Sequence, residues 1–274
     1  MGRASRNSAS DGGSGKKKNR AVLIIALLLI AVIGAGFGVY KIHGIRAEKK
    51  AEELARLEAE KEAEKEAERK AAEEAERQKK AEESKEWYLL LVNPWNRMPD
   101  DFEIETADVE KGYVIDSRVR DALSQMLADC RAAGYSPQII STFRTRETQQ
   151  YLYDHTANKD DTAYPGTSEH ECGLAADIID SGSAGWSDPL IKKQEDMPAQ
   201  KWLMEHCQDY GFILRYPEDK EDITGIIYEP WHYRYVGKEH AANIMKSGVC
   251  LEEYLQNEFG VENVTGSPEE KIGR

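Results

Sequence analysis

The chain has 274 residues and a formal net charge of −13 at pH 7, and its charges are unevenly distributed. Residues 1–86 contain 19 Lys and Arg against 16 Asp and Glu, whereas residues 87–274 contain 18 against 34. No basic stripe runs along the chain, so nucleic acid is not an expected partner. Because residues 87–274 are acidic as a whole, they must recognise any acidic substrate through individual cationic groups.

The first forty residues divide into a polar basic tail and an apolar run. Residues 1–20 are rich in Gly and Ser and end in a basic cluster, so we expect a flexible cytoplasmic tail. Residues 21–40 carry no charge, and as a helix they match a bilayer core ~30 Å thick. The basic cluster then places everything after Tyr40 outside the cell, on a single-pass anchor. A cleaved signal peptide, with its shorter apolar region of ~7–15 residues, is the alternative.

Residues 41–86 are dominated by Ala, Glu, Lys and Arg, which are strong helix formers. Acid-first pairs at i,i+4, such as Glu66 with Lys70 and Glu73 with Arg77, favour a helix. Large apolar residues are too sparse to sustain a heptad seam, so we expect a solvated helical stalk on a monomer. A dimer joined through Ala-rich faces is the less favoured alternative.

Residues 87–259 mix helical and strand patterns, which predicts an α+β domain: a small antiparallel sheet with flanking helices. Residues 260–274 are polar and are expected to form a flexible C-terminal tail. The predicted strands span residues 89–92, 136–143, 174–179, 212–216 and 226–236, and the predicted helices span residues 116–134, 146–157, 198–210 and 238–246.

The four cysteines form no Cys-x-x-Cys pair, so a thiolate zinc knuckle is not expected. An exterior location permits up to two disulfides, with three possible pairings. Free buried thiols are an equal alternative. The residues concerned are Cys130, Cys172, Cys207 and Cys250.

Two short stretches carry the chemistry: residues 168–177 and residues 229–232. Side chains alternate faces along a strand, so two neighbouring strands can direct Asp177 and His232 into one cleft. His170 precedes Gly173 in a loop that can fold its imidazole back toward Asp177. Two imidazoles and one carboxylate are a ligand set for catalytic Zn²⁺, which keeps a fourth position open for water.

A spare carboxylate, Glu229, lies three residues before His232, which is the wrong parity for a straight strand. Pro230 breaks the ladder and can swing Glu229 over the open side of the metal. Glu229 is therefore the candidate general base for a metal-activated water. The remaining histidines of the domain, His155, His206 and His240, have no acidic partner at metal spacing and are expected to be packing or surface residues.

Residues 89–255 resemble the VanY-type D-alanyl-D-alanine carboxypeptidases, within the wider group of lysostaphin-type peptidases and hedgehog domains. The resemblance covers none of residues 1–86. It rests on four runs in order: Ser141-Thr142-Phe143-Arg144 with Gln149, Ser168-x-His170-x-x-Gly173-x-Ala175-x-Asp177, residues 211–217 (GFILRYP), and residues 229–237 (EPWHYRYVG).

The resemblance implies Zn²⁺ on His170, Asp177 and His232, with Glu229 as the base. It also implies that Arg144 polarises the scissile carbonyl or holds the substrate, while Ser168 and Gln149 bind the peptide. Cys172 beside His170 is not needed as a ligand.

The implied function is a zinc-dependent D,D-carboxypeptidase that removes the terminal D-Ala from peptidoglycan stem peptides outside the membrane. An L,D-carboxypeptidase acting on tetrapeptide stems requires the same equipment. A catalytically silent zinc-containing module that binds the cell wall is an alternative of a different class, although the presence of both Glu229 and Arg144 favours an enzyme.

Overall fold

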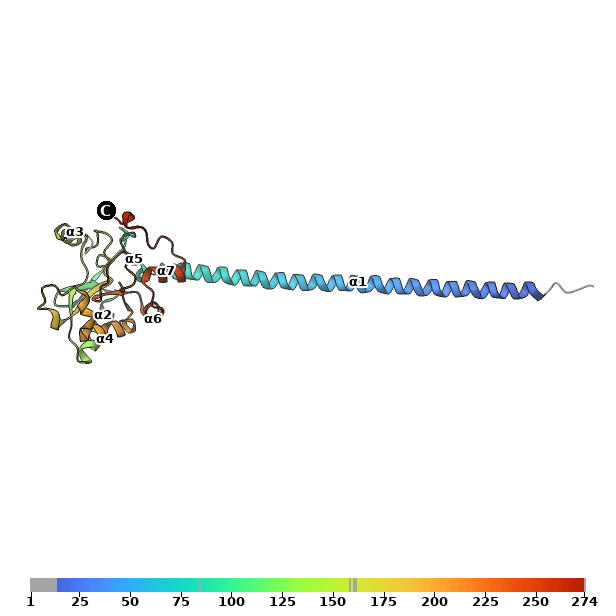
Figure 1. The fold of residues 1–274 in the computed structure, drawn as a ribbon, viewed down its shortest axis with the longest axis horizontal. Helices are drawn as coiled ribbons and strands as arrows, with labels where there is room; N and C mark the ends of the chain where they lie inside the picture. Colours follow the sequence, from blue (N-terminus) through green and yellow to red (C-terminus); the bar gives the residue numbers. More distant parts are fainter. Residues whose placement is uncertain (1–13, 84, 158, 160–161, 274) are drawn as a thin grey trace, which may run out of the picture. The chain divides into compact units, whose positions relative to one another are not determined.

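The structure is a computed structural model that describes residues 14–83, 85–157, 159 and 162–273. The chain divides into two compact units, residues 1–73 and residues 74–274. The described part of the first unit is one continuous helix, α1 (Ser14–Glu83), whose last turns belong to the second unit (Figure 1).

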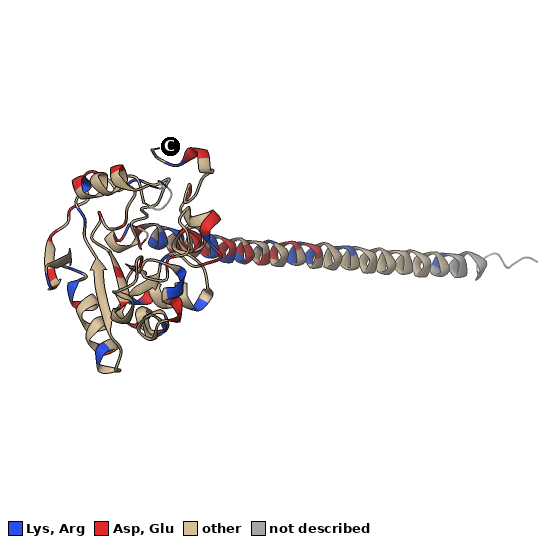
Figure 2. Ribbon diagram, turned by 60° about the vertical axis from the view of Figure 1, so that its left-hand side comes forward, with Lys and Arg blue, Asp and Glu red and all other residues tan. Residues whose placement is uncertain are grey.

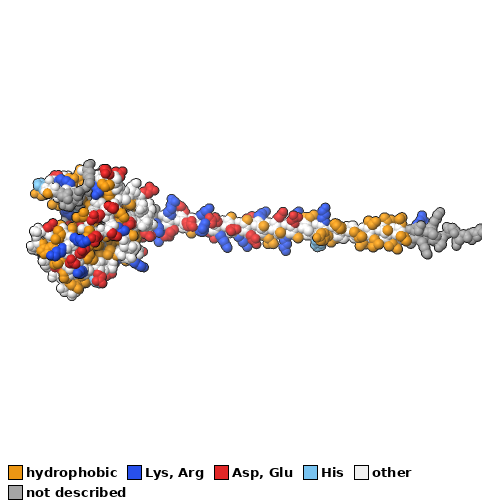
Figure 3. All heavy atoms as spheres, viewed as in Figure 1, with side chains coloured by type: hydrophobic (Ala, Val, Ile, Leu, Met, Phe, Trp, Pro, Cys, Tyr) orange, Lys and Arg blue, Asp and Glu red, His pale blue; other side chains and the backbone are white. Residues whose placement is uncertain are grey.

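Helix α1 contains an apolar stretch followed by a charged one. An 18-residue window reaches a mean hydropathy of 2.9, and its side chains are exposed, so this helix is long and apolar enough to cross a membrane. Figure 3 shows the apolar stretch, and Figure 2 shows residues of both charges along the part that follows. Residues 14–20, which we assigned to the flexible tail, are helical. Residues 1–13 lie outside the described residues.

The second unit holds a two-stranded hairpin and a four-stranded antiparallel sheet. The hairpin joins β1 (Thr106–Glu110) to β2 (Tyr113–Asp116) through Lys111 and Gly112, which both have positive φ angles, as a tight hairpin turn requires. The order of the larger sheet is β3-β4-β6-β5. Its strands are β3 (Pro137–Ser141), β4 (Ala175–Asp180), β5 (Phe212–Leu214) and β6 (His232–Tyr235).

Helices cover the sheet through two hydrophobic clusters. Alternate residues of β4, Ala176 and Ile178, are buried together with α2 and α4. A second cluster joins Ile213 of β5 to α6 and α7. The helices are α2 (Arg120–Ala132), α3 (Arg146–His155), α4 (Pro198–His206), α5 (Glu221–Thr224), α6 (Lys238–Ser247) and α7 (Leu251–Phe259). The expected mixed α+β architecture is confirmed.

The segment that follows α1 differs from the prediction. Residues 89–92 form no strand; a short 3-10 turn, Trp87–Leu89, ends at the first of them. Leu89 and Val92 are nevertheless buried, and the carbonyls of Tyr88 and Leu90 accept hydrogen bonds from the side chain of Arg234. An apolar run predicts burial. Here two backbone carbonyls accept hydrogen bonds from a guanidinium rather than from a neighbouring strand.

The other departures lie at element boundaries. The helix expected from residue 116 begins at Arg120, because Asp116 ends β2 and its carboxylate binds Arg118. The strand expected over residues 226–236 is confined to β6. All four cysteines are free and buried, so the structure contains no disulfide.

The C-terminal residues are packed rather than free. The side chain of Asn93 donates to the carbonyl of Val264 at 2.8 Å, and the indole of Trp95 donates to the carbonyl of Ser267 at 2.8 Å. Val264 is buried. The expectation of a flexible tail therefore fails for residues 260–273, because their backbone is tied to the segment before β1; residue 274 is outside the described residues.

Candidate metal centre and active site

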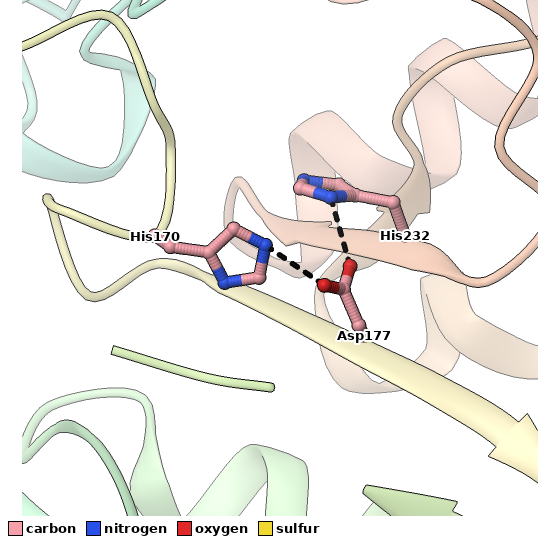
Figure 4. Close-up of side chains that lie close together, drawn as sticks. All are labelled: His170, Asp177 and His232. Carbon is pink, nitrogen blue, oxygen red and sulfur yellow. Dashed lines mark ion pairs between the residues drawn. The ribbon is translucent and has the colours of Figure 1, made fainter. Parts of the chain in front are cut away.

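Two paired strands and one loop bring the predicted ligands together. Strands β4 and β6 are antiparallel neighbours, and Asp177 lies directly opposite His232 in their register. His170 comes from the loop before β4, as Figure 4 shows. Gly173 lets this loop turn, because its φ is +67° and an added Cβ would lie 3.2 Å from the backbone nitrogen of Asp116.

The three side chains converge on one point. Nε2 of His170 lies 3.1 Å from Oδ2 of Asp177, and Nδ1 of His232 lies 3.1 Å from Oδ1. The two rings stand at 86° to each other. The candidate ligand atoms all lie within 4.8 Å of one another, and each residue is buried. This is the spacing that one shared cation would require.

The outer nitrogens of both rings have acceptors of their own. Nδ1 of His170 lies 2.6 Å from the carbonyl oxygen of Thr142, and Nε2 of His232 lies 3.3 Å from Oε2 of Glu169. With one proton each, on these outer nitrogens, both rings would direct lone pairs toward Asp177. Oδ1 of Asp177 is buried and has no hydrogen bond among the described residues. Lone pairs that face a carboxylate at this distance fit a bound cation, and two nitrogens with one oxygen suit Zn²⁺.

The electrostatics of the site favour positive charge at this point. Burial tends to raise the pKa of Asp177, but the two histidines outweigh it and hold this pKa well below its usual range. Burial tends to lower the pKa of His232, but the carboxylates of Asp177 and Glu169, which face its two ring nitrogens, raise it to about 9. Burial and the neighbouring guanidinium of Arg144 lower the pKa of His170 to about 4.

Glu229 reaches the centre through a turn. The backbone N–H of His232 donates to the carbonyl of Glu229 at 3.2 Å, so residues 229–232 form a turn with Pro230 at its second position. This turn overcomes the parity problem: Oε2 of Glu229 lies 3.5 Å from Nδ1 of His232. Burial raises the pKa of Glu229 to about 7, which suits a group that must take and release a proton near neutral pH.

Arg144 and Gln149 lie on the other side of the centre. Nη1 of Arg144 donates to Oε1 of Gln149 at 3.0 Å, and Nη2 lies 3.7 Å from Oδ2 of Asp177. Nε of Arg144 is buried without a hydrogen bond among the described residues. Gln149 is fixed in turn by a hydrogen bond from Nε2 to the carbonyl of Ala163. The guanidinium is thus held in place and keeps donor capacity to spare.

These groups share one cleft of about 720 Å³, which is large enough for a peptide end. Every site residue expected from the sequence lines it: Arg144, Gln149, Ser168, His170, Asp177, Glu229 and His232. Apolar side chains of Leu152, Leu190 and Trp231 contribute to its walls. Figure 4 shows how the three candidate ligands point toward one another.

The remaining candidates are not part of the three-residue metal centre, although His155 lines the same cleft. Nδ1 of His155 lies 2.7 Å from the carbonyl of Tyr151, and the ring of His206 lies 3.5 Å from Asp209. His240 packs against Tyr254. The thiol of Cys172 donates to the carbonyl of Glu169, and burial raises its pKa to about 11, so it offers no thiolate ligand.

Sequence reasoning missed Glu169 and Tyr216. Glu169 is adjacent to a ligand in the chain but reaches the other histidine, His232. Tyr216 lines the cleft with its ring centroid 4.8 Å from that of His232. The run of residues 211–217 already marked Tyr216 as part of a motif, whereas nothing in the sequence indicated the direction of Glu169.

An antiparallel sheet that presents two imidazoles, a carboxylate ligand and a separate buried glutamate defines a candidate zinc-peptidase centre. Residues 113–238 match the family profile described as "VanY: D-alanyl-D-alanine carboxypeptidase". A D-alanyl-D-alanine carboxypeptidase of Enterococcus faecalis is 37% identical over 196 residues, which cover 66% of this chain and 70% of the relative. The chain therefore belongs to the VanY family of D-alanyl-D-alanine carboxypeptidases.

Solved structures agree with this assignment. VanYB in complex with D-alanine-D-alanine is 38% identical, with a TM-score of 0.56, over 63% of this chain and 99% of that one. A mutant VanY D,D-pentapeptidase from a VanB-type vancomycin resistance cassette, in complex with Zn(II), is 39% identical with a TM-score of 0.54, over 62% and 99%. The LD-carboxypeptidase LdcB is 34% identical with a TM-score of 0.53, over 61% and 84%.

Proposed function

We propose that this protein is a zinc-dependent D,D-carboxypeptidase that removes the terminal D-Ala from peptidoglycan stem peptides outside the membrane. The observation that carries the proposal is the convergence of His170, Asp177 and His232 on one point, with Glu229 beside it in the same cleft. Membership of the VanY family supports the same activity and the same metal.

The three ligands would hold Zn²⁺, which when bound supplies a Lewis acid and lowers the pKa of water toward about 7. Glu229 takes a proton from the attacking water and then delivers it to the leaving amine. Its pKa of about 7 allows both transfers near neutral pH. The candidate ligands are buried, so charge stabilisation by fixed groups is stronger there than in bulk water.

Arg144 supplies the fixed positive charge. Gln149 holds one arm of its guanidinium, and the remaining Nη N–H groups can bind the scissile carbonyl oxygen or the terminal carboxylate of the substrate. Ser168 lines the cleft and offers a hydroxyl to the same peptide end. Together these groups favour binding of a peptide with a free carboxyl terminus.

The bond that is cut separates the two leading activities. A D,D-enzyme cuts a pentapeptide that ends in D-Ala-D-Ala, and an L,D-enzyme cuts a tetrapeptide that ends in a single D-Ala. The likeness to LdcB keeps the second activity as the alternative. Incubating residues 74–274 with synthetic pentapeptide and tetrapeptide stems, followed by mass spectrometry, distinguishes them by the product formed.

We expect loss of one alanine from the pentapeptide, an intact tetrapeptide, and no reaction after the metal has been removed with a chelator. Readdition of Zn²⁺ restores hydrolysis. Cleavage of the tetrapeptide alone assigns the L,D activity. Hydrolysis that persists without metal rejects the zinc mechanism, and binding without cleavage assigns a silent wall-binding module.

The N-terminal region fits a membrane anchor with a spacer. In this proposal residues 1–20 lie in the cytoplasm, residues 21–40 span the membrane, and residues 41–86 form a solvated stalk before the enzyme domain of residues 87–259. The apolar window of α1 and its exposed side chains support it. Protease added outside intact cells should release the domain. A protected domain would reverse the topology, and a soluble secreted form would indicate signal cleavage.

A further inference from the structure

Four charged side chains lie completely inside the second unit, behind the candidate metal centre. Glu169, Arg215, Arg234 and Glu252 are each exposed by 1% or less. Two cations and two anions balance in charge, but a buried ionic cluster is weak evidence for stability, because desolvation offsets the attraction between the charges. Stability alone therefore does not account for this cluster.

Glu169 is the member that contacts the metal centre. Its Oε1 accepts from Nε of Arg215 at 2.7 Å and from Nη1 of Arg234 at 2.6 Å. Its Oε2 lies 3.3 Å from Nε2 of His232. One oxygen is thus occupied by two guanidiniums, and the other faces the imidazole. An ionised carboxylate can only accept, so with a cation held at Nδ1 the one proton of the ring lies on the nitrogen that faces Glu169.

We propose that Glu169 is a positioning residue that fixes His232 as the Nε2–H tautomer, so that Nδ1 keeps its lone pair for the metal. The inference rests on the proposed zinc site. A ligating histidine whose other nitrogen donates to a carboxylate is held in orientation and made more basic, and loss of such a partner costs about 10–100-fold in metal affinity.

The rest of the cluster prevents Glu169 from turning away. Arg215 is held by both oxygens of Glu252, at 2.9 and 2.6 Å. Arg234 donates to the carbonyls of Tyr88 and Leu90 as well as to Glu169. The acceptor for the ring is therefore anchored on α7 and on the segment that follows α1. Glu169 also directly precedes the ligand His170 in the chain. One loop therefore orients both His170 and His232.

Glu252 provides the matched control. It is as deeply buried as Glu169 and binds the same Arg215, but its side-chain hydrogen bonds among the described residues are to Arg215 and Asn93, and none reaches His232. A purely structural role predicts similar behaviour for the two glutamates. A positioning role predicts that only Glu169 affects the metal.

The test uses the full chain in detergent micelles, stripped of metal and titrated with Zn²⁺ against a chromophoric chelator. We expect Glu169→Gln to bind Zn²⁺ about 10–100-fold more weakly than the wild type. Glu252→Gln, in which Arg234 still holds Glu169, should stay within about threefold. Unchanged affinity in Glu169→Gln, or equal losses in both variants, would overturn the inference. If the wild type itself binds no Zn²⁺, the proposed function fails instead.

A second measurement needs no substitution in the cluster and decides the matter if Glu169→Gln does not fold. Nitrogen-15 NMR of the histidine rings in the zinc-loaded wild type reports which nitrogen carries each proton. We expect an Nε2–H proton on His232, protected from exchange with water, and an Nδ1–H proton on His170. A proton on Nδ1 of His232, or an Nε2–H in rapid exchange with solvent, contradicts the role of Glu169.

Discussion

The same pair of residue types has two different environments in this molecule. In α1, Glu66 and Arg69 lie 2.8 Å apart with side chains 44% and 64% exposed. In the second unit, Glu169 and Arg215 lie 2.7 Å apart and are fully buried. The distances agree, but the consequences differ: an exposed helical pair contributes about 0.3–0.5 kcal/mol, whereas breaking a buried pair costs about 3–5 kcal/mol. Burial, rather than distance, separates a solvated stalk from a constrained site.

The largest expected effect comes from truncating the chain at different positions between α1 and the rest of the second unit. Removing residues 1–73 should leave a folded enzyme, because residues 74–274 form a compact unit. Removing residues 1–92 should abolish folding: it exposes the contacts of buried Leu89 and Val92, about 1.5–3 kcal/mol each, and strips carbonyl acceptors from Arg234. Circular dichroism and stem-peptide hydrolysis measure both outcomes.

A cut after residue 86 lies between these two. Among the described residues it removes the ion pair of Lys80 with Glu258, the contact of Glu83 with His240 and the hydrogen bond from the Leu89 N–H to the Glu86 carbonyl, so activity should persist. A folded and active fragment 93–274 would show that the segment after α1 is dispensable, and an inactive fragment 74–274 would show that the stalk does more than space.

The substitution Glu252→Gln tests the buried ion pairs of the second unit. We expect the free energy of unfolding of residues 74–274 to fall by about 3 kcal/mol, because Arg215 loses its bidentate partner while remaining buried. Chemical denaturation of the wild type and the variant measures the difference. A loss below about 1 kcal/mol would mean that the cluster is penetrated by water and resembles the exposed pairs of α1.

The catalytic side is probed by Glu229→Gln. This change keeps the shape of the side chain but removes the base, so kcat should fall by at least about a hundredfold while Zn²⁺ stays bound. Steady-state hydrolysis of the pentapeptide and metal analysis of the same sample provide the two readouts. A variant near the wild-type rate would place the base elsewhere.

The pH profile is the control for this assignment. Glu229 acts when it is ionised, so kcat/KM should fall about tenfold for each pH unit below its pKa. Burial raises that pKa to about 7, and a bound cation lowers it again, so the acid limb should lie at or below pH 7. This limb should be absent from the residual activity of Glu229→Gln.

Local patterns predicted much of the candidate site. Strand alternation is enough to place Asp177 and His232 on one face, and the register confirms that they are opposite each other. Proline chemistry at residue 230 predicted the break that turns Glu229 toward the centre. Both inferences depend on a few consecutive residues, and for that reason the sequence alone contains them.

Features that depend on distant partners were not predictable. The apolar run at residues 89–92 predicts burial correctly but not its partner, which is Arg234, far along the chain. The hairpin of β1 and β2 and helix α7 left weak signals: Gly112 in a turn, and the spacing of Leu251, Tyr254 and Leu255 on one helical face. The bond between Glu169 and His232 left none, because adjacent residues in a loop can point in any direction.

The smallest expected effect concerns the exposed ion pairs of α1. In a peptide spanning residues 52–82, Glu66→Gln removes partners of Arg69 and Lys70 and should lower helix stability by about 0.2–0.5 kcal/mol. Thermal unfolding followed by circular dichroism measures this, and about 1 M salt should remove most of the difference, because exposed charges are screened. The same change in the full chain should leave stem-peptide hydrolysis unaltered. A larger or salt-independent loss would mean that Glu66 packs against a second helix, since a solitary solvated stalk gives this carboxylate no other partner.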